Sequence, residues 1–191
     1  YRGSDIIAGG FGTGVGTAAL LDSDEPILGV CASYTTIRNL NLVTHGSPQV
    51  VEYGLLVCKL YSTQGAQNNY FDKISVDLNR TKAGSVGIVS LNTTAPGGFP
   101  GTNSYNTYRD LEIKDCASGM WLYGVNTATG PADVGNKIIT SAPDVFNIIG
   151  DPSTPNDITG GTSYGLSING QYGFTINNCI IQNEKKQQQI S

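Results

Sequence analysis

The sequence is poor in charge and in the residues that build metal and nucleophilic sites. Only 14% of its 191 residues are Asp, Glu, Lys or Arg, against about 25% in a typical soluble domain. It has a single His, His45, and its four Cys form no CxxC pair; they are Cys31, Cys58, Cys116 and Cys179. A zinc site needs a tighter cluster of such ligands, so we predict no metal and no cofactor. The wide Cys spacing also favours thiols over disulfides.

Long apolar runs and basic clusters are missing as well. No run approaches the roughly 18 apolar residues of a membrane-spanning helix, so we expect no membrane insertion. The 11 Lys and Arg are scattered and are outnumbered by 15 Asp and Glu, which gives a net charge of −4. Nucleic-acid binding normally requires a basic stripe, so no nucleic-acid partner is expected.

The sequence contains instead a repeated hexad of the form apolar, polar, polar, apolar, any residue, apolar. Its copies begin at Ile37, Phe71, Tyr108 and Ile176. The first two gaps are 34 and 37 residues, and the last is 68, which leaves room for one degenerate copy. Either Ile138-Ile139 or the segment 145–148 could supply that copy, and the sequence does not distinguish them. A second element, Gly followed by alternating apolar residues, recurs at Gly54, Gly87, Gly119 and Gly165.

Alternation with a period of two indicates strands, and recurrence at about 34 residues indicates stacked coils. We therefore predict an all-β fold, a right-handed parallel β-helix, in one domain spanning 1–191. Residues 1–36 are expected to form irregular first coils, 37–183 regular coils and 184–191 a polar tail. An antiparallel sandwich would explain short strands but not the recurring hexad.

Stacking the hexads predicts which residues become neighbours. Leu40, Ile74, Leu111 and Cys179 should form one buried inward row. In the two polar positions, Asp72 should lie between Arg38 and Arg109, and Lys73 beside Asp110. Such cross-strand charge pairs stabilise a sheet by a few tenths of a kcal/mol each, so these carboxylates have a structural role available.

Two segments carry a resemblance to a known family: Ile-x-Asn-Leu-x-Leu at 37–42 and Tyr-Gly-Leu-x-Ile-x-Gly at 164–170. They resemble the pectate-lyase-like parallel β-helix superfamily, and the low charge and long Gly-rich loops look like bacteriophage tailspikes. The resemblance covers roughly residues 30–183. It implies a homotrimer that binds host-surface polysaccharide and in many cases cleaves it. The chain lacks the Asn-x-Asp, Asp-Asp, His-Gly and Arg-x-Lys series of polygalacturonases, so no catalytic residue transfers from that pattern.

Glycoside hydrolysis requires two carboxyl groups about 5 to 9.5 Å apart. Carboxylates in adjacent coils on one face can meet that spacing, and our candidates are Asp77, Asp110, Glu112 and Asp115. The alternative for each is a solvated surface carboxylate.

The single Trp, Trp121, should face outward, because Met120 and Leu122 continue the inward alternation. Sugar rings stack on aromatic faces, so Trp121 is a candidate substrate-binding residue, with Tyr105, Tyr123 and Tyr164 in adjoining segments. The alternative is a subunit interface, because Leu56 and Val89 should align with Trp121 in an apolar stripe.

These observations favour a tailspike-like virion appendage that recognises, and could cleave, host-surface polysaccharide. One alternative is a structural or adhesive virion component without catalysis. Another is a fragment of a secreted microbial polysaccharide lyase or hydrolase.

Overall fold

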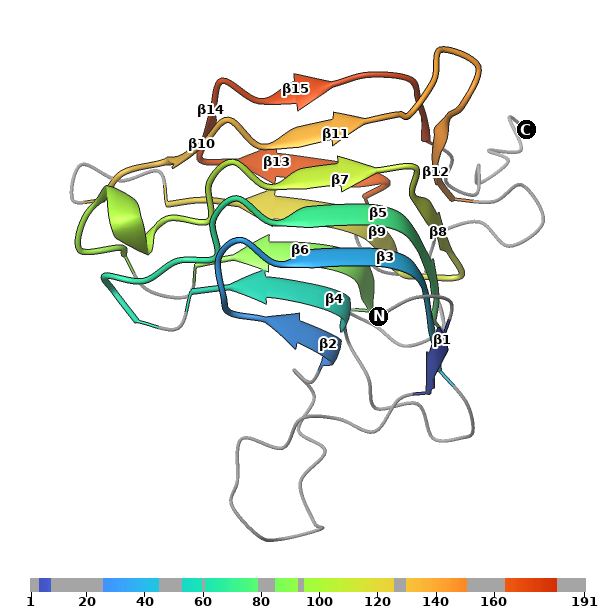
Figure 1. The fold of residues 1–191 in the computed structure, drawn as a ribbon, viewed down its shortest axis with the longest axis horizontal. Helices are drawn as coiled ribbons and strands as arrows, with labels where there is room; N and C mark the ends of the chain where they lie inside the picture. The colour runs from blue at the N-terminus through green and yellow to red at the C-terminus, as the bar shows by residue number, and fades with distance from the viewer. Residues whose placement is uncertain are drawn as a thin grey trace, which may run out of the picture.

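The chain folds as a β-solenoid of parallel strands, as the repeat predicts (Figure 1). A computed structural model describes residues 4–7, 26–44, 53–59, 61–78, 85–92, 95–125, 130–150 and 164–181. Its coils of about 34 residues stack so that strands of one coil pair in parallel with those of the next. In Figure 1 the blue N-terminal strands lie at one end of the stack and the orange-red C-terminal strands at the other.

One wall of the solenoid is a parallel sheet of five strands, which we call sheet B. Its strands are β2 (Pro26–Val30), β4 (Tyr53–Cys58), β6 (Val86–Leu91), β9 (Ser118–Tyr123) and β13 (Leu166–Asn169). They follow one another in chain order, so each coil contributes one strand. The pairing of β2 with β4 shows that regular stacking begins by residue 26.

The other wall is a nine-stranded sheet, sheet A, which is bent into two limbs. The first two full coils cross both limbs with one strand each, β3 (Thr36–Val43) and β5 (Tyr70–Asp77). In later coils limb 1 holds β7 (Thr107–Arg109), β11 (Lys137–Ile139) and β15 (Thr175–Ile176). Limb 2 holds β8 (Glu112–Lys114), β12 (Asn147–Ile149) and β16 (Cys179–Ile181), and β1 (Ser4–Ile7) pairs with β3. A two-stranded pair, β10 (Asp133–Val134) with β14 (Gln171–Tyr172), and the 3-10 turn η1 (Phe99–Gly101) complete the described elements.

The bend between the limbs occurs at one residue per coil with a positive φ angle. The φ angle is 51° at Asn39, 55° at Lys73, 53° at Asp110 and 48° at Asn178. Asn and Asp enter this left-handed region more readily than most residues, because their short side chains bond locally. These residues are the third positions of the hexads. The recurring polar position therefore marks the corner at which the chain turns from limb 1 to limb 2.

The degenerate coil uses both of the segments that the sequence left open. Ile138 lies opposite Tyr108 in limb 1, whereas Ile149 lies opposite Ile113 in limb 2. The segment 140–146 takes the place of the single corner residue found in the other hexads. An insertion at the corner thus hides the copy in the sequence without disturbing either limb.

The predicted inward row is confirmed for three of its four members. Leu40, Ile74 and Leu111 are stacked in register and no more than 2% exposed, and Cys179 continues the row but is half-buried near the last coil. The fourth coil places Asn147 in this row, fully buried. Its Oδ1 accepts the backbone N–H of Leu111 at 2.9 Å, and its Nδ2 donates to the Ile139 carbonyl at 2.9 Å, which ties the insertion to the neighbouring coil.

A ladder of buried Asn side chains runs through the turn that precedes limb 1. Asn69, Asn106 and Asn136 come directly before β5, β7 and β11 and are at most 1% exposed. Asn69 Oδ1 accepts the N–H of Thr35 at 2.8 Å. Asn106 Oδ1 accepts the N–H of Asn69 at 3.0 Å, and Asn136 Oδ1 accepts the N–H of Asn106 at 2.8 Å. Each side chain therefore satisfies the backbone of the preceding coil where the ladder of sheet A has not yet begun.

The recurring Gly of sheet B is required by close packing at the corner between limb 2 and sheet B. A Cβ at Gly54 would overlap the Val76 side chain, and one at Gly87 would overlap the Ile113 side chain and lie 2.7 Å from the Gly119 carbonyl oxygen. Limb 2 and sheet B thus meet where only Gly fits, which explains why the second sequence element begins with this residue.

Candidate functional site

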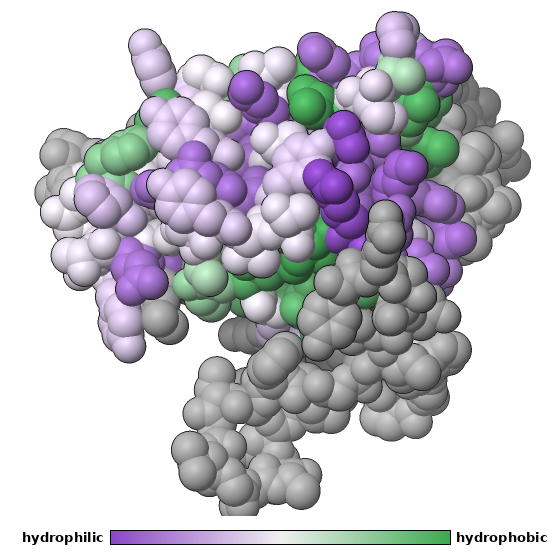
Figure 2. Space-filling view, in the orientation of Figure 1, coloured by the Kyte–Doolittle hydropathy of each residue, from purple (hydrophilic) through white to green (hydrophobic). Residues whose placement is uncertain are grey.

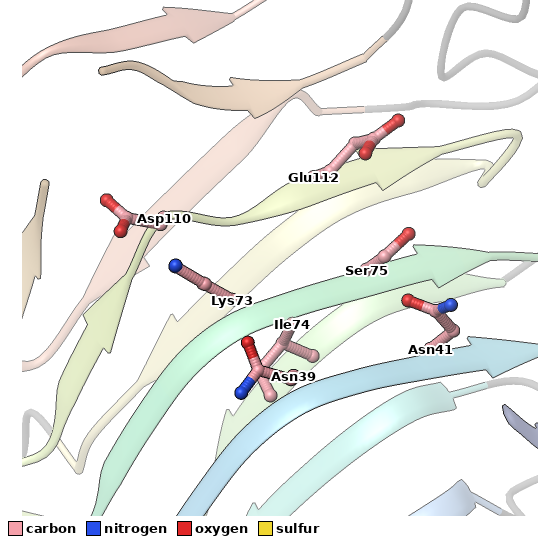
Figure 3. Close-up of a pocket in the computed structure, with 7 residues that line it drawn as sticks. All are labelled: Asn39, Asn41, Lys73, Ile74, Ser75, Asp110 and Glu112. Atoms are coloured by element: carbon pink, nitrogen blue, oxygen red, sulfur yellow. The ribbon is translucent and has the colours of Figure 1, made fainter. Parts of the chain in front are cut away.

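A shallow groove of about 360 Å³ crosses the corner and limb 2 of three successive coils (Figure 3). It is lined by Asn39, Asn41, Lys73, Ile74, Ser75, Asp110 and Glu112. In Figure 3, Asn41, Ser75 and Glu112 project from adjacent strands, and Lys73 extends toward Asp110. The groove thus combines amides, a hydroxyl, an ammonium and two of the predicted carboxylates.

The fold places these side chains through two rows of the hexad. Asn41 lies opposite Ser75 in register, and Ser75 lies opposite Glu112; these fifth positions alternate with buried residues and therefore face outward. The corner residues Asn39, Lys73 and Asp110 flank that row. Because successive coils repeat the same positions, the groove presents similar groups at intervals of about 4.8 Å, the spacing of paired strands.

A second cluster of charge adjoins the groove through Glu112. Lys114 Nζ lies 3.6 Å from Glu112 Oε1 and 3.7 Å from Asp77 Oδ2. Because both oxygens are within 3.7 Å of one nitrogen, their separation is less than twice that distance. This limit is compatible with the roughly 5 to 9.5 Å that separates the carboxyl groups of glycosidases.

The environment of Asp77 differs from that of an ordinary surface carboxylate. Partial burial raises the pKa of its carboxyl, and the neighbouring charges of Asp115 and Glu112 raise it further, although the Lys114 ammonium opposes the shift. A carboxyl whose pKa is raised by its surroundings is the kind of group that general acid catalysis uses. The structure thus brings Asp77 and Glu112 to Lys114, with the charge of Asp115 acting on Asp77 and with Asp110 in the adjoining groove.

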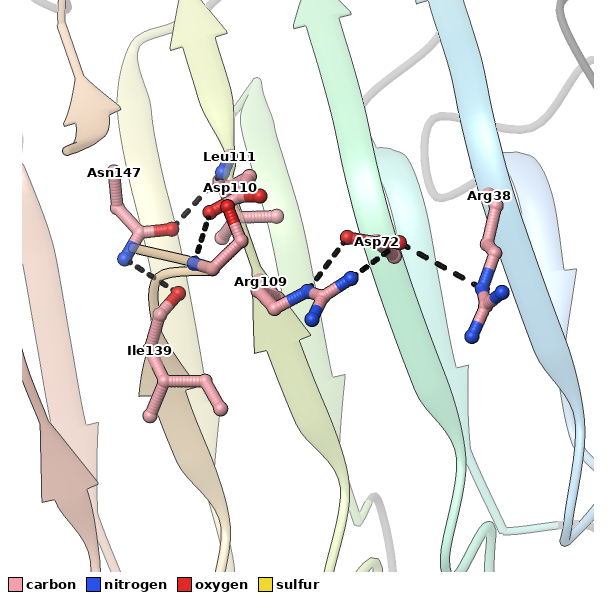
Figure 4. A network of polar contacts seen from close by, with 8 residues as sticks. Arg38, Asp72, Arg109, Asp110, Leu111, Ile139 and Asn147 are labelled. Carbon is pink, nitrogen blue, oxygen red and sulfur yellow. Dashed lines mark hydrogen bonds and ion pairs between the residues drawn. The ribbon is translucent and has the colours of Figure 1, made fainter. Parts of the chain in front are cut away.

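The predicted charge ladder is confirmed on limb 1 (Figure 4). Asp72 lies between Arg109, whose Nε and Nη2 donate to it at 2.8 and 2.9 Å, and Arg38, whose Nε is 3.6 Å away. The hydrogen bond from Arg109 lowers the pKa of the Asp72 carboxyl. The Asp72 side chain is only 7% exposed, so little of it is accessible to a ligand. Both guanidinium groups lie over the Tyr70 ring, at 5.3 and 5.2 Å from its centroid. Asp72 is therefore a structural carboxylate. The described part of the face shown in Figure 2 is mostly hydrophilic.

The structure also assigns Asp110 a local bond. Its Oδ1 accepts the backbone N–H of Ser141 at 2.8 Å, from the insertion at the corner of the next coil (Figure 4). The carboxylate is therefore oriented by the backbone while it lines the groove. Because Asp110 both accepts a backbone hydrogen bond and lines the groove, a binding or orienting role is favoured over that of a proton donor.

None of the predicted aromatic residues lines the groove. Trp121 and Tyr123 stack on the outer face of sheet B, with centroids 5.5 Å apart and ring planes at 8°. Tyr105 lies in the turn before β7 against Phe99, and Tyr164 precedes β13, where its N–H bonds Ser118 Oγ at 3.1 Å. The corner at Asp115 separates limb 2 from sheet B, so outward side chains of the two walls face different directions.

Sequence reasoning named the groove's carboxylates but not its neutral polar residues. Asn41 and Ser75 went unnoticed because the fifth hexad position was treated as free. The signal was present: that position is polar in three consecutive copies, Asn41, Ser75 and Glu112. His45 lies outside the described residues.

Comparison of the chain with models of known protein families, with curated proteins and with solved structures gave no significant match. Within the described residues, no group of three or more His, Cys, Asp or Glu side chains is arranged to hold a metal ion. In the same part of the chain, no helix has the length and apolar character needed to cross a membrane.

Proposed function

We propose that this protein is a virion-appendage β-solenoid that binds host-surface polysaccharide. The ligand would lie in the groove lined by the corner residues Asn39, Lys73 and Asp110 and by Asn41, Ser75 and Glu112. The observation that supports this proposal most directly is the composition of the groove. Amide, hydroxyl, ammonium and carboxylate groups from three coils point into one shallow channel. Sugars present a dense array of hydroxyl groups, which both donate and accept hydrogen bonds, and such a mixed lining can satisfy them.

The repetition of the groove fits a chain ligand better than a small molecule. Polar side chains recur from coil to coil, in Asn41, Ser75 and Glu112 and at the corner residues, so successive residues of a polymer can each meet hydrogen-bonding partners. The groove is open, and six of its seven lining residues are polar or charged, unlike the enclosed apolar pockets that bind most small ligands. An extended polysaccharide lying across the strands is therefore the ligand class that we propose.

The adjoining carboxyl pair supports hydrolysis as an extension of the same proposal. The Asp77 carboxyl would donate its proton to the glycosidic oxygen as the bond from that oxygen to the anomeric carbon breaks. Glu112 would take a proton from the water that forms the new bond to the same carbon. The cycle closes when Asp77 recovers a proton from solvent and Glu112 releases the proton that it took from water.

We expect the double variant Asn41→Ala, Ser75→Ala to bind polysaccharide at least tenfold more weakly than wild type. Each side chain faces the groove, and the loss of a hydrogen bond to a ligand typically costs about 1 kcal/mol, so two losses exceed tenfold. The measurement is titration calorimetry or a glycan array with capsular and lipopolysaccharide preparations. Asp144→Asn, at an exposed position in the 140–146 insertion, is the matched surface control.

Cleavage is measured in the same experiment as new reducing ends. Asp77→Asn and Glu112→Gln should each abolish hydrolysis while leaving binding within a few-fold of wild type. Binding without any new reducing ends would identify a non-catalytic adhesin. If the groove variants bind every tested polysaccharide as wild type does, the groove is not the binding site.

The outer face of sheet B supports assembly as a second role. Leu56, Val89 and Trp121 lie in register there, as the Gly alignment predicts. Leu56 and Trp121 are half-buried and leave apolar surface for a partner chain, whereas Val89 is already covered within the chain. We propose a homotrimer with this face at the interface.

Trp121→Ala should therefore convert the trimer to monomer in light scattering, because truncating a central aromatic anchor typically costs an interface at least 2 kcal/mol. Tyr61→Ala, which removes an aromatic ring that is 63% exposed, is the control and should leave the mass unchanged. If Trp121→Ala stays trimeric but loses polysaccharide binding, the face is a glycan platform instead. A monomeric wild type would exclude the assembly proposal.

A further inference from the structure

Two cysteines that are distant in the sequence become neighbours on the outer face of sheet B. Val30 of β2 lies opposite Val57 of β4 in parallel register, and Cys31 and Cys58 directly follow them. The 27 residues that separate them are one coil in this part of the solenoid. The wide spacing of the cysteines in the sequence did not reveal that these two are neighbours; all four cysteines are free thiols in the structure.

The strand register is compatible with a disulfide. Paired parallel strands lie about 4.8 Å apart, and disulfides form between residues whose Cα atoms are about 4.4 to 6.8 Å apart. Alternation places Cys58 on the side opposite the fully buried Val57, and the Cys31 and Cys58 thiols hydrogen-bond to each other. Both side chains are half-buried, so a small reagent can reach them.

We propose that Cys31 and Cys58 form a reversible redox site, a dithiol that closes to a disulfide linking the first two coils. The oxidant of the two thiols would be a low-molecular-weight disulfide of the glutathione class. This proposal does not depend on polysaccharide binding, because the pair lies on sheet B rather than limb 2.

The two sulfurs have unequal roles. The hydrogen bond from Cys58 lowers the pKa of the Cys31 thiol to about 7, whereas the same bond and burial raise the pKa of Cys58. Cys31 is therefore the nucleophile, since the thiolate is the reactive form. Its thiolate attacks one sulfur of oxidised glutathione, forming a mixed disulfide and releasing one glutathione thiolate. Cys58 loses its proton and attacks the Cys31 sulfur, which releases the second glutathione; the two protons end on the two glutathione thiols.

The remaining cysteines provide internal controls. Cys116 is 0% exposed, burial raises the pKa of its thiol, and that thiol donates to the Lys114 carbonyl at 3.1 Å. Cys179 lies in β16 of sheet A, and its thiol donates to the Asn177 carbonyl at 3.6 Å. Neither is placed on sheet B near the proposed pair.

The test is oxidation of the native chain with oxidised glutathione at pH 8, followed by alkylation and peptide mass spectrometry. We expect one cross-linked peptide pair containing Cys31 and Cys58, with Cys116 and Cys179 recovered as thiols. The bond should raise the Tm by roughly 5 to 10 °C, because it closes a 27-residue loop in the unfolded chain, and dithiothreitol should reverse the rise.

Variants separate this site from general oxidation. Cys31→Ser and Cys58→Ser should each abolish the cross-link and the Tm rise, whereas Cys179→Ser should leave both unchanged. Recovery of Cys31 and Cys58 as alkylated thiols after oxidation of the wild type would overturn the proposal. So would a glutathione adduct on Cys31 that never resolves to the cross-link. Because these two outcomes are read on the wild-type chain, they hold even if a Ser variant fails to fold.

Discussion

Replacing Asn106 with Leu should lower the free energy of unfolding by about 3 to 5 kcal/mol and the Tm by roughly 10 °C. Asn106 is 0% exposed and is the central rung of the Asn ladder. Its Oδ1 accepts the N–H of Asn69 at 3.0 Å, and its Nδ2 donates to the Ala66 carbonyl at 2.8 Å. Leu can make neither bond, so two buried backbone groups lose their partners, each at a typical cost of 1 to 3 kcal/mol.

The measurement is equilibrium unfolding in urea, followed by circular dichroism. Asn177→Leu is the matched control: the same substitution at an exposed hexad position outside the ladder should change the free energy by no more than about 0.5 kcal/mol. Equal effects of the two substitutions would show that the ladder is not a source of stability. A smaller m-value for Asn106→Leu would indicate that the coils no longer unfold as one unit.

The fold was predictable because each coil of the solenoid repeats the same residue pattern for the same structural reasons. The same inward positions, the same corner residue and the same Gly recur in each coil, so a single sequence shows the pattern several times. The register between Arg38, Asp72 and Arg109 followed from the hexad alone and is confirmed by the ion pairs. The Asn ladder escaped notice although its members stand at a fixed place, two residues before Phe71, Tyr108 and Ile138, because that place lies in a turn without apolar alternation.

The site was predictable only in part, because outward positions carry little patterning. The four candidate carboxylates were chosen for their places beside inward residues, and two of them, Asp77 and Glu112, lie at Lys114. The aromatic candidates lie apart from them, because the sharp corner at Asp115 turns the chain between β8 and β9. The φ angle of 50° that creates this corner has no equivalent in the hexad and was not readable from the sequence.

The pH dependence of stability should be dominated between pH 4 and 7 by one buried carboxyl, Asp133. It is 0% exposed, and burial raises its pKa to about 6. Three hydrogen bonds oppose that shift: the N–H of Asn103 and the Nδ2 of Asn92 donate to Oδ1 at 2.9 and 3.1 Å, and the Nε2 of Gln171 donates to Oδ2 at 3.2 Å. They do not cancel it, because no cation is among these partners.

The sign of the effect follows from where the proton is held more tightly. The unfolded chain has an Asp pKa of about 3.9, so between pH 4 and 6 the folded state binds more protons than the unfolded state. The stabilising contribution is complete below pH 4 and is lost as the pH rises through 6. A shift of about two pKa units corresponds to a loss on the order of 3 kcal/mol in the free energy of unfolding.

Urea unfolding of wild type and Asp133→Asn at intervals from pH 4 to 7 measures this contribution as the difference between two curves. The wild type should lose on the order of 3 kcal/mol relative to the variant across that range. Subtracting the two curves removes the contributions of the other carboxyls to the free energy of unfolding. These include Asp77, whose pKa is also raised, and Asp72, whose lowered pKa affects stability below pH 4. Asp144→Asn, an exposed control, should reproduce the wild-type curve. If Asp133→Asn runs parallel to wild type instead, Asp133 is ionised throughout and its three hydrogen bonds outweigh its burial.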